Sequence, residues 1–190
     1  GFAIEAVDPL SGPIATLLPP KASAAVQHAL ERECGVHYHF GTVVEAIDKK
    51  GDGIIATLAN GQKVEADIAL SAIGMRPRIG LARQSGIAVN RGITVNRHLE
   101  TSAPDVYAFG DCAEVEGHVL YYVLPLMACA RALAKTLHGD RTAVVYGPMP
   151  VGVKVTVCPI QVSPPARGAT GEWHEEVVEG DSVRALFQDP

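Results

Sequence analysis

The chain has 190 residues, of which 47% are hydrophobic and 19% are charged, and its formal net charge is −5. This mildly acidic balance argues against nucleic acid as a partner, because phosphate binding needs a basic surface. The most apolar stretch, residues 119–134, is interrupted by Arg131, so we expect no membrane span.

Cysteines and histidines show no obvious metal or disulfide pattern. The four cysteines, at positions 34, 112, 129 and 158, are widely spaced, and the seven histidines look isolated from carboxylates at useful spacing. We therefore predict no metal site and assign no catalytic role to a histidine. Scattered cysteines fit a reducing compartment, and no secretory signal opens the sequence, so we expect a cytoplasmic protein.

The start of the chain has the pattern of a β-α-β unit. Residues 2–8 predict a short strand that ends at a carboxylate. Residues 21–34 predict a helix, because prolines precede it and Gly35 follows it. Residues 36–40 alternate in the way of a second strand.

A meander is expected next. Asn60-Gly61 between alternating runs is a strong hairpin signal. Three short strands are predicted at residues 43–47, 54–58 and 63–66. The apolar run 68–73 then predicts a buried parallel strand that ends at Gly74.

The second half of the chain predicts further strands around one long helix. Residues 125–137 are apolar nearly all round, which is typical of a buried helix. The other expected elements are a hairpin of 87–89 with 93–95, a strand at 106–109, an apolar strand at 151–157, and a hairpin within 173–187.

The chain has no G-x-G-x-x-G turn, although a dinucleotide-binding unit needs one to hold the pyrophosphate. Asp8 nevertheless follows the first strand pattern as an acidic residue follows the second strand of such a unit. The simplest interpretation is that the chain begins partway through a dinucleotide-binding domain. We therefore interpret it as a fragment.

Two motifs resemble those of the flavoproteins with two dinucleotide-binding domains. Residues 101–111, TSAPDVYAFGD, resemble their second flavin fingerprint, and residues 66–77, ADIALSAIGMRP, resemble their exit from the NAD domain. A narrower resemblance, to the rubredoxin reductases, is carried by residues 110–114, 123–134, 146–151 and 153–154. It covers nearly the whole chain and weakens after residue 165.

The resemblance implies an α/β fold, with Rossmann-like three-layer units, an inserted β-meander and the start of a small α+β C-terminal domain. It implies an NAD-binding domain at 1–78 without its first strand and glycine-rich turn, and the C-terminal half of an FAD-binding domain at 79–143. Residues 144–190 would begin the C-terminal domain.

Four residues are candidates for contact with FAD. Asp111 would accept a hydrogen bond from a ribityl hydroxyl, and Gly110 would let the ligand approach the backbone. The resemblance places the N-terminus of the following helix, with the Val123 backbone, beneath the pyrimidine ring, and lets Lys154 reach the flavin. The alternatives are a turn aspartate, a plain core helix and a solvent-facing lysine.

Two residues are candidates for contact with NAD. Asp8 would accept a hydrogen bond from the adenosine ribose 2′-OH and disfavour NADP, and Gly74 would bring backbone beside the nicotinamide half. The alternatives are a surface aspartate before Pro9 and a glycine that serves strand-end packing.

The function implied is transfer of electrons from NADH through FAD to rubredoxin or a similar small iron carrier. The flavin performs the chemistry, so no side chain is assigned as catalytic. A related reductase with ferredoxin, a disulfide or oxygen as acceptor remains an alternative, as does a non-enzymatic nucleotide-binding module. The chain alone is expected to lack tightly bound FAD and to be inactive.

Overall fold

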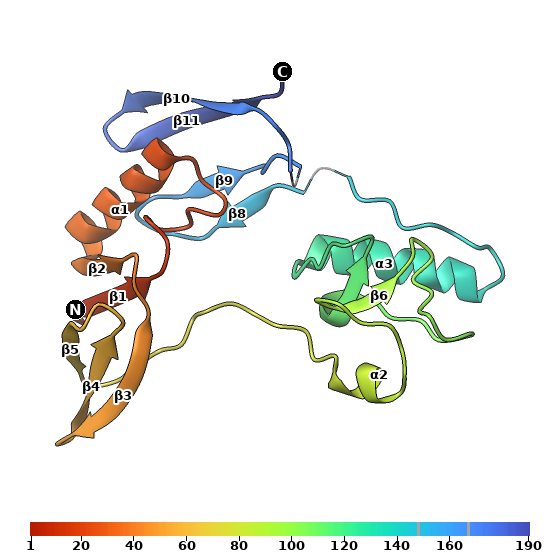
Figure 1. Ribbon diagram of the computed structural model, residues 1–190. Coiled ribbons are helices and arrows are strands. Elements are labelled where there is room, and N and C mark those ends of the chain that lie inside the picture. Colours follow the sequence, from red (N-terminus) through yellow and green to blue (C-terminus); the bar gives the residue numbers. More distant parts are fainter. Residues whose placement is uncertain (148, 167) are drawn as a thin grey trace. The chain divides into compact units, whose positions relative to one another are not determined.

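The computed structural model describes residues 1–147, 149–166 and 168–190. The chain divides into two compact units, shown in Figure 1. Unit 1 comprises Gly1–Ser71 with Pro150–Pro190, and unit 2 comprises Ala72–Met149. The predicted domains at 1–78, 79–143 and 144–190 are functional divisions and stay a prediction.

Unit 1 begins with the predicted β-α-β unit. The parallel strands β1 (Ile4–Asp8) and β2 (Val36–Phe40) are joined by α1 (Pro20–Cys34). Proline occupies the first turn of α1, and Gly35 ends the helix with a left-handed φ of 64°, as such stop signals predict. These three predictions are confirmed.

The predicted meander follows. Strands β3 (Val44–Lys50), β4 (Gly53–Leu58) and β5 (Lys63–Ala66) form an antiparallel sheet in chain order. Gly61 in the turn from β4 to β5 has a φ of 84°, which the Asn-Gly signal anticipates. The prediction of an inserted meander is therefore confirmed.

The prediction of a buried parallel strand at 68–73 is wrong. Ile68, Leu70 and Ile73 are 83%, 90% and 96% exposed, and the segment pairs with no strand among the described residues. A parallel strand is buried only when neighbours pair with it and helices cover its faces. An apolar composition shows that a segment could form a buried strand, but the strand forms only if neighbouring strands pair with it.

The rest of unit 1 contains two hairpins. Strands β8 (Val151–Val153) and β9 (Ile160–Val162) pair antiparallel, as do β10 (Glu172–Glu179) and β11 (Ser182–Gln188), which confirms the predicted terminal hairpin. The strand predicted at 151–157 is too long, because the backbone turns after β8 with a bond from Cys158 N–H to the Val155 carbonyl.

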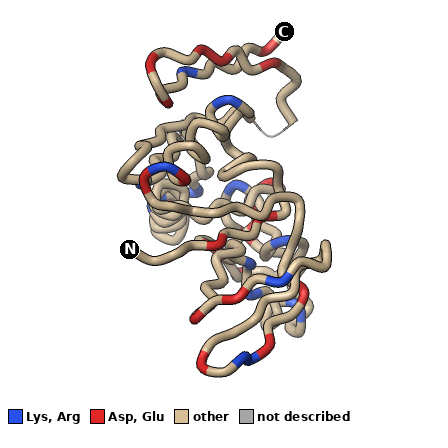
Figure 2. Tube along the Cα trace, turned by 90° about the vertical axis from the view of Figure 1, so that its left-hand side faces the viewer, with Lys and Arg blue, Asp and Glu red and all other residues tan. Residues whose placement is uncertain are grey.

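The terminal hairpin packs against α1. The Arg32 guanidinium forms an ion pair of 2.6 Å with Asp181, and the Ala22 N–H donates to the Glu175 carboxylate at 2.9 Å. Acidic residues predominate on this hairpin, with Arg184 as its basic side chain (Figure 2).

Unit 2 is built around one long helix. Its elements are α2 (Gly80–Gln84), β6 (Ile93–Val95), the 3₁₀ turn η1 (Gly110–Cys112), β7 (Ala113–Val115) and α3 (Val123–Leu137), with β6 and β7 parallel. The core of the unit consists of Val95, Leu99, Ala108, Ala113, Val115, Cys129, Ala132 and Val144.

Two strand predictions in unit 2 are wrong in extent. Residues 106–109 form only one bridge, between Glu100 and Tyr107, and residues 87–89 contribute only a bridge between Val89 and Ile93. The ladder of unit 2 is instead formed by β6 and β7, which pair with each other. The two segments make only scattered backbone bonds, such as those from Thr94 N–H to the Ala88 carbonyl and from Ala108 N–H to the Leu99 carbonyl.

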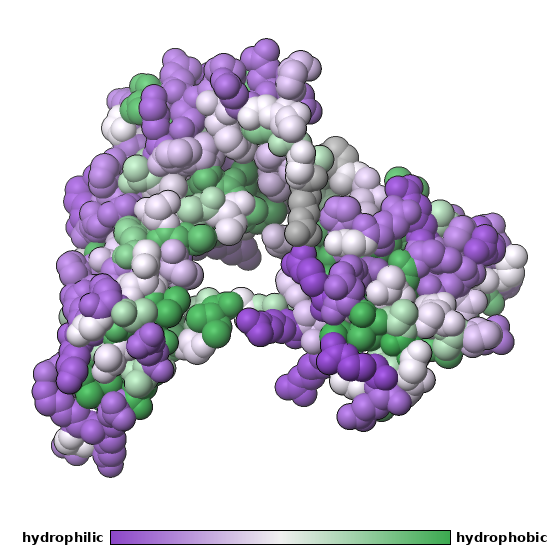
Figure 3. Space-filling view, viewed as in Figure 1, coloured by the Kyte–Doolittle hydropathy of each residue, from purple (hydrophilic) through white to green (hydrophobic). Residues whose placement is uncertain are grey.

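The helix α3 is present as predicted, but it is not buried all round. Its buried residues are Pro125, Cys129 and Ala132, whereas Val123 and Leu124 are 72% and 60% exposed. Hydrophobic residues reach the surface in both units (Figure 3). Among the described residues, no helix is both long and apolar enough to cross a membrane.

Candidate functional site

The structure places the predicted site residues in both units. Gly74, Gly110, Asp111 and Val123 lie in unit 2, where they can be related to one another, and Asp8 and Lys154 lie in unit 1. Unit 2 contains the 101–111 motif and the end of the 66–77 motif, residues 72–77.

Gly110 opens the turn that carries Asp111. Its φ of 80° lies in the left-handed region, which L side chains rarely adopt. A Cβ at this position would lie 3.0 Å from Leu126 Cδ1 of α3. Both the backbone conformation and the packing of α3 against η1 therefore call for glycine here.

A buried carboxylate three residues later holds the turn in place. Glu114 is 3% exposed and accepts hydrogen bonds of 2.9 Å from Asn90 Nδ2 and from the Gly92 N–H. Burial raises the pKa of Glu114, but these hydrogen bonds outweigh it and hold that pKa below its ordinary value. A Cβ on Gly92 would lie 2.9 Å from the Cys112 carbonyl oxygen, so this loop and η1 are in close contact.

An open cavity of about 350 Å³ lies beside Asp111. Its volume falls within the range of small-molecule sites. The cavity is lined by Met75, Arg76, Pro77, Arg78, Asp111, Cys112 and Tyr121. The structure thus brings the end of the 66–77 motif next to the last residue of the 101–111 motif.

The chemistry of this cavity suits a ligand with both hydroxyl and anionic groups. The Asp111 side chain is exposed, and no hydrogen bond to its carboxylate occurs within the described parts of the chain. Arg76 and Arg78 supply guanidinium groups, which bind phosphate and carboxylate oxygens. These two arginines were not among the predicted site residues, although the R-P-R run at 76–78 is visible in the sequence.

The N-terminus of α3 is free of a side-chain cap among the residues described. Tyr122, at the N-cap position, is extended, and Val123 begins the helix. The first N–H groups of a helix carry partial positive charge and favour an anion nearby. This end of α3 therefore has the polarity that a contact with a flavin would need, and its role at Val123 stays a prediction.

Gly74 and Asp8 are the two residues predicted to contact NAD. Gly74 has a φ of 90°, and a Cβ there would meet nothing within 4 Å, so the backbone conformation rather than packing calls for glycine. Asp8 ends β1, and its Oδ1 accepts a 2.8 Å hydrogen bond from the Leu10 N–H. Oδ2 of Asp8 is left for another donor.

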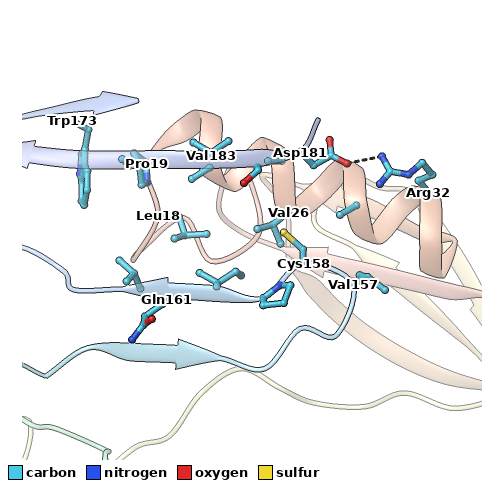
Figure 4. A pocket seen from close by; sticks show the side chains of 18 residues that line it. Leu18, Pro19, Val26, Arg32, Val157, Cys158, Gln161, Trp173, Asp181 and Val183 are labelled. Atoms are coloured by element: carbon cyan, nitrogen blue, oxygen red, sulfur yellow. Dashed lines mark hydrogen bonds and ion pairs between the residues drawn. The ribbon is translucent and has the colours of Figure 1, made fainter. Parts of the chain in front are cut away.

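Lys154 directly follows β8 and is exposed, so it is not inside a strand as predicted. Unit 1 also contains a groove of about 420 Å³ between α1 and strands β9 to β11 (Figure 4). Leu18, Val26 and Val183 give it an apolar lining, and the pair of Arg32 with Asp181 lies at one side. None of the predicted site residues lines this groove.

The prediction that all histidines are isolated is wrong. His37 and His39 of β2 each form a hydrogen bond with the carboxylate of Glu5 on β1. The partner lies 32 residues away in sequence from His37, and only the parallel pairing of β1 and β2 brings it close. The H-x-H spacing in a strand was the signal that could have revealed this cluster, because it places both rings on one face.

Comparison with known families defines the class of the protein. Residues 4–136 match the model of the pyridine nucleotide-disulphide oxidoreductase family, and the chain therefore belongs to that family. Residues 143–190 match the model of the rubredoxin binding C-terminal domain. The first of these matches contains both motifs that line the cavity of unit 2.

Among curated proteins, the chain is similar to two rubredoxin-NAD(+) reductases. It is 50% identical over 189 residues to the protein of Alcanivorax borkumensis, covering 99% of this chain and 49% of that protein. It is 46% identical to the protein of Acinetobacter baylyi, covering 98% and 48%. The recognised family resemblance is thus confirmed, and the chain spans about half the length of these relatives.

Solved structures share the fold. A ferredoxin reductase from Rhodopseudomonas palustris matches 100% of this chain and 48% of its own, with a TM-score of 0.86 and 23% identity. Putidaredoxin reductase, in a covalent complex with putidaredoxin, matches 98% and 46%, with a TM-score of 0.81 and 21% identity. The predicted α/β class is confirmed.

Proposed function

We propose that this chain is part of an NADH-dependent, FAD-containing reductase that passes electrons to rubredoxin. The observation that carries the proposal is the cavity of unit 2, where Asp111 meets Arg76 and Arg78. These residues fit a ligand with hydroxyl and phosphate groups, as FAD has. The match of 143–190 to a rubredoxin-binding domain supports the acceptor, and the names of the relatives support NAD as the nucleotide.

The flavin, when bound, would supply the step that splits a two-electron hydride into single electrons. The chain would hold and polarise it. Asp111 would accept a hydrogen bond from a ribityl hydroxyl, and Gly110 would give that ligand access to the backbone. The N-terminus of α3 at Val123 would stabilise negative charge on the pyrimidine side. The family resemblance adds Lys154 as a further candidate contact of the flavin.

For the nucleotide, Asp8 would accept from the ribose 2′-OH through the carboxylate oxygen that Leu10 does not use. Gly74, with its positive φ, would turn the backbone beside the nicotinamide half. The carboxylate of Asp8 would also repel a 2′-phosphate, so we propose NADH rather than NADPH. The four free cysteines support a cytoplasmic protein.

The test is made with the full-length protein of which this chain is proposed to be a part. Stopped-flow mixing with NADH and rubredoxin should bleach the flavin absorption and then restore it as rubredoxin is reduced. Asp111→Asn should weaken flavin retention by roughly 10- to 150-fold, because a hydrogen bond to a charged group contributes about 1.5–3 kcal/mol. The matched control Asp140→Asn, at an exposed position of unit 2, should change nothing.

Three outcomes would contradict the proposal. Unchanged flavin affinity in Asp111→Asn would remove Asp111 from the site. A protein whose reduced flavin ignores rubredoxin but reduces another carrier would change the acceptor. That second outcome has support, because the chain is also 36% identical over 174 residues to a nitric oxide reductase FlRd-NAD(+) reductase of Salmonella arizonae, covering 92% of this chain and 46% of that protein. A full-length protein without flavin absorption would instead favour a non-enzymatic role.

A further inference from the structure

Three metal-ligating side chains converge on one face of the β1–β2 pair. Glu5 and His37 are direct partners in the parallel register, and His39 lies two residues further along β2. Residues two apart in a strand share a face. His37 Nδ1 and His39 Nε2 lie 2.8 Å and 2.7 Å from the same oxygen, Oε2 of Glu5, and the three candidate ligand atoms all lie within 4.8 Å of one another.

The two histidines project from one face of the strand pair. The alternate residues Tyr38 and Phe40 project from the opposite face, where their rings stack with centroids 4.8 Å apart. Burial, and then the charges of Glu31, Cys34 and Asp8, raise the pKa of Tyr38. The histidine cluster therefore occupies a separate surface of the strand pair.

One side chain of the cluster is buried, and the other two are accessible to solvent. The His39 side chain is only 7% exposed, so packing holds its ring in place. The side chains of His37 and Glu5 are 68% and 38% exposed, so an ion can reach them from solvent. Because the His39 side chain is already held rigidly, less conformational entropy is lost when it binds an ion.

We propose that Glu5, His37 and His39 form a binding site for a divalent transition metal ion, with Zn²⁺ as the ion that suits the donors. Two imidazoles and one carboxylate are a recurrent zinc donor set that leaves the fourth position to water. With bonds of about 2.0–2.2 Å, tetrahedral ligands are separated by roughly 3.3 Å. Each ring nitrogen would therefore move about half an ångström away from Glu5 Oε2, and the two nitrogens, which lie within 4.8 Å of each other, would take the same separation of roughly 3.3 Å.

The protonation states of the cluster are compatible with this ion. Metal ligands must be a carboxylate and neutral imidazoles. A glutamate side chain is ionised at neutral pH. On ion binding, each neutral ring would carry its single proton on the nitrogen that faces away from the ion, in place of the hydrogen bond that it now shares with Glu5. The proposal is independent of the proposed electron transfer.

The experiment measures ion binding to the 190-residue chain. Cysteines are first blocked with N-ethylmaleimide, because exposed Cys34 would otherwise bind the same ions. Zn²⁺ binding is followed by isothermal titration calorimetry, and Co²⁺ serves as a visible probe of tetrahedral coordination that Zn²⁺ should displace. We expect one ion per chain.

The variants separate this site from others. His37→Gln is the main one, because a residue so exposed can be changed without disturbing the fold, and Glu5→Gln and His39→Gln complete the set. Each should weaken Zn²⁺ binding by at least about tenfold. The control His174→Gln changes an exposed histidine of β10 and should bind as the parent chain does.

Two results would overturn the proposal. One is the lack of saturable one-to-one binding by the parent chain. The other is binding that persists in His37→Gln and Glu5→Gln with far-UV circular dichroism unchanged, which would place the ion elsewhere. If His39→Gln alone loses its circular dichroism, the two exposed-residue variants still decide.

Discussion

Replacing Glu114 by glutamine should loosen the turn that carries Asp111. The carboxylate accepts one hydrogen bond from Asn90 and one from the Gly92 N–H, each 2.9 Å long, in a position that is 3% exposed. Glutamine keeps one acceptor oxygen, but its amide NH₂ must face one of these two donors. A buried donor left without an acceptor costs about 1–3 kcal/mol, and loss of the charge weakens the bond that remains.

We therefore expect Glu114→Gln to lower the local free energy of opening by about 2–4 kcal/mol. Amide hydrogen exchange of residues 90–95, followed by mass spectrometry, should accelerate roughly 30- to 900-fold, since every 1.4 kcal/mol is a factor of ten. Exchange reports local opening and does not require the two units to unfold together. Exchange in the meander of unit 1 provides an internal reference.

The pH dependence of this difference follows from the pKa of Glu114. Because that pKa is lower in the folded protein than its usual value of 4.5, the stabilisation is complete above the unfolded value and is lost as the pH falls through the folded one. The gap between parent and variant should thus be full near pH 7 and shrink as the pH falls below 4.5.

A matched control separates this effect from a general loss of charge. Glu116→Gln removes a carboxylate two residues away, in an exposed pair with Arg97 whose side chains are 50% and 58% exposed. Exposed ion pairs contribute about 0–1 kcal/mol, so exchange should change less than about fivefold. Equal acceleration in both variants, or none in Glu114→Gln, would refute the reasoning.

Two further predictions concern unit 2. Gly110→Ala should destabilise the unit by about 1–3 kcal/mol in urea unfolding, because position 110 combines a φ of 80° with a contact of 3.0 Å to α3. Gly74→Ala has the positive φ without the contact, so it should destabilise the unit less. A larger loss of stability in Gly74→Ala than in Gly110→Ala would contradict the packing argument. The carboxyl of Glu100, held chiefly by the Arg141 guanidinium, should titrate at about 2 by NMR and return toward 4.5 in Arg141→Met. Its stabilising contribution should be complete above pH 4.5 and be lost progressively as the pH falls from 4.5 to about 2.

Local signals in the sequence were sufficient for much of the fold. Prolines before α1 and Gly35 after it mark both ends of that helix, because each acts through its own backbone conformation. The Asn-Gly turn acts in the same way through Gly61. Such elements are predictable because the residues that determine them are neighbours in the chain.

Elements that depend on distant partners were not predictable in this way. Residues 68–73 have the composition of a buried strand, yet Leu70 is 90% exposed because no described strand pairs with it. The contact of Glu5 with His37 arises from the parallel register of β1 and β2. In each case the outcome depends on which segments meet, and composition does not specify that.

The same distinction bears on the two interpretations of Asp111, as a turn residue or as a ligand-binding residue. The carboxylate of a turn aspartate is expected to accept hydrogen bonds from backbone N–H groups. Within the described residues, however, the Asp111 side chain accepts no hydrogen bond. Glu114 takes the structural role instead, since it is buried and satisfies donors of the neighbouring loop. With the turn held by Glu114 and by Gly110, the exposed carboxylate of Asp111 has no structural task, and its position on the cavity beside two arginines favours the ligand-binding interpretation.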